Sequence, residues 1–210
     1  MPVSFPAFAS AVDTYENELP KLLSKNAVTL DGGLDEKGEY ARLVQSYAKR
    51  KRVGLLAKMR YLKACVAAFG KEIPLPLKKL KFPFTFRQEI YMTDSGELTL
   101  SWGVAQKHGF YRLHALLLHE LAHLILSAHK DYPLLLALDK VFLSRHTENA
   151  AATTLSPVEL YATQISVALL DATAQLLEDG EKEQMLAQAA QETEKLRAAY
   201  TLFENGTDKL

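Results

Sequence analysis

Three ionisable side chains lie within one apolar run of the sequence: His119, Glu120 and His123 fall inside LLLHELAHLI, residues 116–125. On a helix, residues four apart lie on one face about one turn apart, so the two imidazoles would point in the same direction. Zinc accepts imidazole nitrogens at about 2.0–2.1 Å, and a catalytic zinc site keeps one coordination position for water. The spacing therefore predicts that His119 and His123 bind one zinc ion, Zn2+.

Glu120 follows the first of these histidines directly. One residue turns a helix by about 100°, so this carboxylate is not expected to bind the metal. It is expected to take a proton from the water that zinc activates and to pass the proton to a leaving amine. The alternative is a core helix whose polar groups are satisfied by neighbours, because burying them unpaired is costly. We interpret Glu120 as the general base.

The motif His119-Glu120-Leu121-Ala122-His123 resembles that of the zincin metallopeptidases. This resemblance covers about residues 84–170 and implies zinc-dependent hydrolysis of peptide bonds. It also implies a motif helix packed beneath a small sheet whose antiparallel edge strand binds the substrate. Apolar residues alternate on both sides of the turn signal Asp94-Ser95-Gly96, which predicts a β-hairpin over about 84–102. The hairpin lies in the sequence where such a strand would be expected.

Glu159 is our preferred third metal ligand; it follows His123 by 36 residues (159 − 123) within SPVELYA. A glutamate on a second helix with an alanine three residues later is the gluzincin arrangement. Together with the motif, Glu159-x-x-Ala162 looks like the ImmA/IrrE-type metallopeptidases, which are intracellular proteases tied to regulator cleavage. However, Ser156 and Glu159 also form a capping box with proline at the first helical position. That local role alone would explain both residues.

His129 is the main alternative to Glu159. It follows the first motif histidine by ten residues, the spacing of the third histidine in metzincins and in SprT-like or WLM-like proteases. That arrangement requires the helix to break after His123, usually at a glycine, and the sequence has neither glycine nor proline there. His146 and Asp139 are further candidates. The sequence therefore leaves the third ligand open.

The rest of the chain predicts helices on both sides of the hairpin. A short amphipathic helix is expected before Pro20, and helical spacing over residues 35–69 predicts two helices divided at Gly54 and capped by Gly70. One further helix is expected after Pro133, a second over about 156–178, and a third over about 181–203. This order predicts an α+β fold, mostly helical and zincin-like, with a small antiparallel sheet above the motif helix.

These elements suggest three regions. Residues 1–80 form an N-terminal helical region packed on the core, residues 81–178 the zincin-like catalytic core, and residues 179–210 a C-terminal amphipathic helix. Within the core, we expect His114 to be a buried structural histidine. Tyr161 is expected to pack in the core, with donation to an oxyanion as the alternative.

Composition narrows the possible partners. The 210 residues carry 25 basic and 25 acidic side chains, so no net charge draws the chain to nucleic acid or anionic lipid. The basic residues over 49–63 are expected to form a solvated helix face. Cys65 is the only cysteine, which excludes an internal disulfide. The N-terminus lacks a secretory pattern and no apolar run approaches about 20 residues, so we expect a cytoplasmic protein without a membrane partner.

The sequence thus predicts a zinc metallopeptidase acting on a peptide or protein substrate, with its oligomeric state open. One alternative is a catalytically latent zincin-fold protein that works as a regulatory or protein-binding module. Another is a DNA-associated SprT-like protease whose basic helix contacts DNA, although nucleic acid is the less expected partner.

Overall fold

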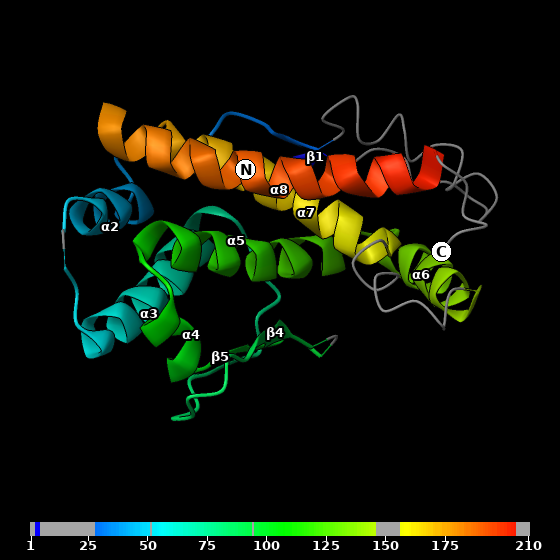
Figure 1. Ribbon diagram of the computed structural model, residues 1–210, viewed down its shortest axis with the longest axis horizontal. Helices are drawn as coiled ribbons and strands as arrows, with labels where there is room; N and C mark the ends of the chain where they lie inside the picture. The colour runs from blue at the N-terminus through cyan, green and yellow to red at the C-terminus, as the bar shows by residue number, and fades with distance from the viewer. Residues whose placement is uncertain (1–2, 5–27, 51, 94, 146–155, 205–210) are drawn as a thin grey trace.

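The computed structural model describes residues 3–4, 28–50, 52–93, 95–145 and 156–204 (Figure 1). Helices dominate, and two small sheets accompany them, so the chain is α+β. The helices are α2 (Glu39–Ala48), α3 (Leu55–Glu72), α4 (Trp102–Lys107), α5 (Phe110–Ser127), α6 (Tyr132–Arg145), α7 (Pro157–Ala174) and α8 (Asp179–Glu204). The strands are β1 (Val3–Ser4), β2 (Thr29–Leu30), β3 (Lys79–Lys81), β4 (Ile90–Met92) and β5 (Glu97–Leu100).

Most of the predicted helices are present, with shifted ends. Gly54 does divide the region 35–69, because it is the N-cap of α3. Gly70 was predicted as a C-cap and this is wrong, since α3 continues through it to Glu72. α8 begins at Asp179, where a break was predicted, because acidic residues in a first turn favour a helix start. The helix expected before Pro20 lies outside the described residues.

The predicted antiparallel sheet is a mixed one. Its order is β3-β5-β4, with β4 antiparallel and β3 parallel to β5. The hairpin is confirmed at its centre, where Gly96 takes a φ of 81° that other residues rarely adopt. Phe84 and Phe86 were predicted to alternate within the first strand, but they lie in the loop between β3 and β4. There the loop backbone bonds to residues 101–103 and not to a strand partner.

The motif helix α5 lies between α7 and α8 on one side and β4 on the other (Figure 1). A helix that is apolar around most of its surface has to be covered on most sides. The burial follows that rule, because Leu117, Leu118, Leu121 and Ala122 are fully enclosed. None of the described helices combines the length and apolarity needed to cross a membrane. The fold thus places the motif inside the core with one side turned to the sheet.

A chain of buried hydrogen bonds ties α5 to three other helices through His114. Thr173 donates its hydroxyl proton to Leu169 O at 2.7 Å, so it must accept from Tyr40, 2.9 Å away. Tyr40 therefore accepts from His114 Nε2 at 2.8 Å, and Nδ1 accepts from Tyr61 at 2.8 Å. Burial lowers the pKa of His114 to about 3. His114 is thus a neutral core histidine with a defined tautomer.

Candidate metal centre

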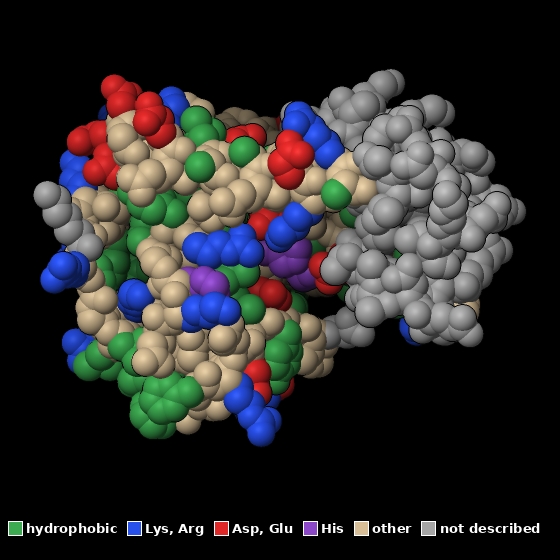
Figure 2. Space-filling model, in the orientation of Figure 1, with side chains coloured by type: hydrophobic (Ala, Val, Ile, Leu, Met, Phe, Trp, Pro, Cys, Tyr) green, Lys and Arg blue, Asp and Glu red, His purple; other side chains and the backbone are tan. Residues whose placement is uncertain are grey.

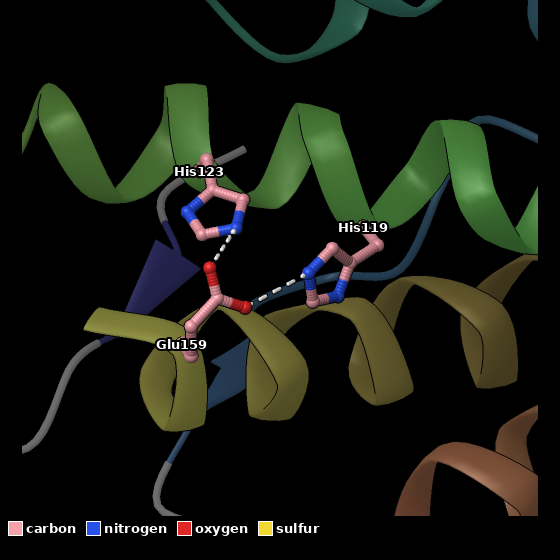
Figure 3. A group of neighbouring side chains, drawn as sticks. All are labelled: His119, His123 and Glu159. Atoms are coloured by element: carbon pink, nitrogen blue, oxygen red, sulfur yellow. Dashed lines mark ion pairs between the residues drawn. The ribbon is translucent and has the colours of Figure 1, made fainter. Parts of the chain in front are cut away.

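Two helices bring three potential metal ligands together. His119 and His123 point from α5 toward α7, with ring centroids 5.0 Å apart and planes 81° apart. Glu159 points back at them from the first turn of α7 (Figure 3). Its Oε2 lies 3.4 Å from His119 Nε2, and its Oε1 lies 3.4 Å from His123 Nε2. The structure therefore brings together the two motif histidines and the preferred third candidate.

These distances fit a tetrahedral metal site. Two ligand atoms bound at about 2.0–2.1 Å and separated by the tetrahedral angle lie roughly 3.3–3.4 Å apart. Each of the two nitrogen–oxygen distances is 3.4 Å, one to each oxygen of Glu159, and one ligand atom from each residue can be chosen so that all three lie within 4.8 Å of one another. Two nitrogens and one carboxylate oxygen are a donor set that zinc accepts while keeping a fourth position for water. The residues present therefore fit the ion that the sequence predicted.

The start of α7 shows why Glu159 is available. Ser156 is the N-cap, and its Oγ accepts the backbone N–H of Glu159 at 3.4 Å. Asp139 of α6 accepts the backbone N–H of Val158 at 3.0 Å. Other side chains thus satisfy the amides of the first turn, and the Glu159 carboxylate faces the histidines. The capping role and the site role, which compete in the sequence, are divided between serine and glutamate.

The charges of the cluster shift its pKa values in opposite directions. Burial would raise the pKa of Glu159, but hydrogen bonds to His119 and His123 outweigh it and hold the pKa well below its ordinary value. Burial would lower the pKa of His123, but the hydrogen bond and charge of Glu159 outweigh it and raise the pKa. The lowered pKa of Glu159 and the raised pKa of His123 therefore favour a negative carboxylate facing a positively charged His123.

Glu120 lies beside the cluster of His119, His123 and Glu159, on the side of α5 that faces β4. The residue is only 9% exposed, and burial raises its pKa, while the charges of His119 and His123 oppose that rise. The backbone N–H of Met92 in β4 donates to its carboxylate and lowers the pKa slightly. Sequence reasoning missed this contact, because a backbone amide has no residue-type signature. A buried carboxylate with a raised pKa is suited to accept and release a proton.

The other candidates lie elsewhere. α5 ends at Ser127 without a glycine, and His129 in the following turn accepts the backbone N–H of Asp131 at 3.3 Å and does not join the cluster. Asp139 caps α7, and Tyr161 is buried in the core. His146 lies outside the described residues. Within the described part of the chain, the structure thus selects Glu159 as the partner of the motif histidines.

Comparisons of the chain with protein-family models, with curated proteins and with solved structures found no match. No relative therefore contributes a fold name, a substrate or a cofactor. The motif and the geometry of the three side chains are the basis of the functional assignment below.

Proposed function

We propose that the protein is a zinc-dependent metallopeptidase. The observation that carries this proposal is the convergence of Glu159 with His119 and His123 at 3.4 Å, beside the buried carboxylate of Glu120. Two histidines and a glutamate on one helix occur by chance in sequences. A second carboxylate that another helix places within 3.4 Å of both histidines is not explained by helix capping or core packing alone.

In this proposal His119, His123 and Glu159 hold the zinc ion. When bound, the ion supplies Lewis-acid chemistry, which makes water more acidic and polarises a carbonyl group. Glu120 accepts the proton of the attacking water and later gives it to the leaving amine. Its raised pKa supports the second step, because it favours the protonated form that serves as a donor. The enclosed side chains of α5 limit water around these groups.

The open edge of β4 supports a polypeptide substrate. Thr93 N bonds to Glu97 O and Ser101 N bonds to Glu89 O, so Glu89, Tyr91 and Thr93 direct their backbone groups toward β5. In an antiparallel pair, the residues between them direct theirs the other way. Ile90 therefore presents its N–H and C=O groups, and Met92 its C=O group, at the edge beside Glu120, while the Met92 N–H donates to the Glu120 carboxylate. Among the described residues no strand pairs with that edge, so an extended peptide can add to it.

Three of the basic residues over 49–63 have contacts within the molecule, and these contacts disfavour the DNA-associated alternative. Lys49 pairs with Glu178, and the Arg50 guanidinium lies 4.5 Å from the ring centroid of Tyr47. Lys58 donates to the backbone carbonyls of Ala105 in α4 and of His108, the residue that follows α4. These three cations have contacts within the molecule, although Lys49 and Arg50 remain exposed, as do Arg52, Arg60 and Lys63.

The experiment that tests the proposal is hydrolysis of a broad peptide library by the purified, zinc-loaded protein. Glu120→Gln keeps the shape of the side chain and removes its base, so we expect activity to fall by about 10²–10⁴-fold. Glu194→Gln, at an exposed position of α8, is the matched control and should leave activity unchanged. Absence of hydrolysis with stoichiometric zinc, or equal activity in the Glu120→Gln variant, would refute the enzyme and favour the latent module.

A further inference from the structure

The loop between β3 and β4 carries the most exposed large hydrophobic side chains among the described residues. Phe84 is 72% and Phe86 is 61% exposed, and their ring centroids lie 5.6 Å apart. Trp102 packs edge-on against Phe84 at 4.8 Å, and we call these three residues the aromatic tip. Figure 2 shows hydrophobic side chains gathered at the lower end of the molecule, where Figure 1 places this loop. Contiguous exposed apolar groups of this kind mark interaction sites.

The aromatic tip is held in place and is not a loose loop. Trp102 N donates to Pro83 O at 3.3 Å, and Gly103 N donates to Thr85 O at 2.9 Å. Ser101 Oγ donates to Arg87 O at 2.6 Å. A Cβ on Gly103 would collide with the loop backbone, so only glycine permits this close approach. Because the loop is already ordered, a partner would bind without the entropic cost of ordering it.

Charge and ring geometry indicate the chemistry of that partner. Arg87 next to Phe86 is exposed, and the exposed Lys107 donates to Gln88 Oε1 at 2.6 Å, so two cations flank the tip. The Phe84 ring meets the Phe86 ring at 67° and the Trp102 ring at 69°, so both pairs are edge to face. The two phenylalanine rings carry no polar atoms. An apolar side chain next to acidic groups complements this surface, since apolar atoms fill the angle between the rings and carboxylates meet the cations.

The aromatic tip and the open edge of β4 lie close together along the chain. Phe86 precedes Met92 by six residues (92 − 86), and Met92 is the residue whose amide reaches Glu120. Six residues span at most about 20 Å of extended chain. An extended polypeptide lying along β4 with one bond beside Glu120 would therefore reach the tip within about six residues of that bond.

We propose that the aromatic tip is a substrate-docking site, which anchors an apolar side chain flanked by acidic residues within about six positions of the cleaved bond. This inference rests on the proposed function, because it assigns the substrate class of the same site. It selects extended polypeptides with an acidic-apolar segment. A lipid surface would engage the rings and cations but not the backbone edge of β4.

Peptide binding without hydrolysis tests the docking site separately from the peptidase activity. The full chain carrying Glu120→Gln is titrated into a fluorescent 14-residue peptide containing Leu-Phe flanked by glutamates, and into one with serines in place of Leu-Phe. We expect the first peptide to bind about tenfold more tightly or better, as anchor residues do. Phe84→Ser combined with Phe86→Ser should abolish the difference. Leu134→Ser combined with Val141→Ser, which alters exposed apolar residues of α6, should preserve it.

A charge reversal gives a second readout. Arg87→Glu should reverse the preference between the glutamate-flanked peptide and a lysine-flanked one, and added salt should weaken the preference of the starting protein. Equal affinity of the Leu-Phe peptide and the peptide with serines in its place would overturn the proposal. An unchanged preference between them after the double phenylalanine substitution would also overturn it. Binding to phosphatidylcholine–phosphatidylserine vesicles that depends on the two phenylalanines, without peptide preference, would overturn it in favour of a membrane contact.

Discussion

Replacing Glu159 by glutamine should separate the metal site from the fold. The glutamine side chain would retain nearly the same volume and could still accept the N–H of a histidine, but it would lose the negative charge. In the structure both carboxylate oxygens lie 3.4 Å from a histidine Nε2, so the charge faces the cation position directly. The substitution therefore removes one of three ligands and leaves the Ser156 cap of α7 in place.

The expected size of the effect follows from mass action. At free zinc about 1,000 times the dissociation constant, binding to the folded state alone adds about 4.1 kcal/mol to the free energy of unfolding. If loss of the carboxylate weakens zinc binding about 100-fold, the same zinc concentration is about ten times Kd and adds about 1.4 kcal/mol. A domain of this size shifts its Tm by about 2–4 °C per kcal/mol. Zinc should therefore raise the Tm by about 8–16 °C in the starting protein and by about 3–6 °C in the variant.

Thermal unfolding followed by circular dichroism measures both shifts. Each protein is stripped with a chelator, and zinc is then buffered to a set of free concentrations at about pH 7.5, above the ordinary pKa of histidine. Glu194→Gln serves as the matched control, because this glutamate is exposed and pairs only with Arg197 along α8 among the described contacts. The control should reproduce the shift of the starting protein at every zinc concentration.

Two results would refute this reasoning. If zinc raises the Tm of the Glu159→Gln variant as much as that of the starting protein, the carboxylate is not a ligand. If zinc raises neither Tm, the three side chains do not form a zinc site, and the ion pairs of Glu159 with His119 and His123 are structural.

Two further predictions concern pH. In the zinc-free protein the lowered pKa of Glu159 stabilises the fold above about pH 4.5, and this stabilisation is lost as the pH falls through the lowered pKa. The raised pKa of His123 stabilises the fold below about pH 6.5, and this stabilisation is lost as the pH rises through the raised pKa. The stability difference between the starting protein and Glu159→Gln, measured by urea unfolding, should therefore peak between these values, and a flat difference from about pH 4 to 9 would contradict the assignment. The buried neutral His114 titrates near 3 when folded, so the unfolded state takes up a proton first as pH falls. His114→Gln should consequently lose about 2 kcal/mol less stability than the starting protein between about pH 8 and pH 5, and equal losses would contradict the buried neutral state.

The motif could be predicted from the sequence because its geometry is local. Four residues of helix fix the direction of His119 relative to His123, whatever the remaining fold. Glu159 was ambiguous because the pattern Ser156-x-x-Glu159 serves equally as a helix cap. Only the packing of α7 against α5 and the contribution of Asp139 to the cap show that the carboxylate is free to face the histidines. The absence of a glycine after His123 disfavoured His129, and its position in the turn after α5, where it accepts the backbone N–H of Asp131, excludes it from the cluster.

The sheet was predicted less completely, for a physical reason. Alternating apolar residues indicate a strand only when a partner covers one face, and Phe84 and Phe86 alternate without being covered. The parallel partner of β5 was also missed, because Lys79–Lys81 is too short and too basic to give an apolar pattern. Its pairing with Glu97–Thr99 depends on the tertiary position of the chain.

The rotation of α5 about its own axis connects these observations. His114 precedes His119 by five residues, about 140° around a helix, so the buried hydrogen bonds to Tyr40 and Tyr61 act on a different face from the metal ligands. A rotation by one residue, about 100°, would break both bonds and turn the motif histidines away from Glu159. Two faces of one helix are thus fixed together: the core network sets the angle at which the ligands meet α7, and the sheet side holds Glu120 against β4. The apolar side chains around the motif have no directional hydrogen bonds of their own. The rotation angle of α5 is therefore defined by the polar contacts of His114, of the motif histidines and of Glu120.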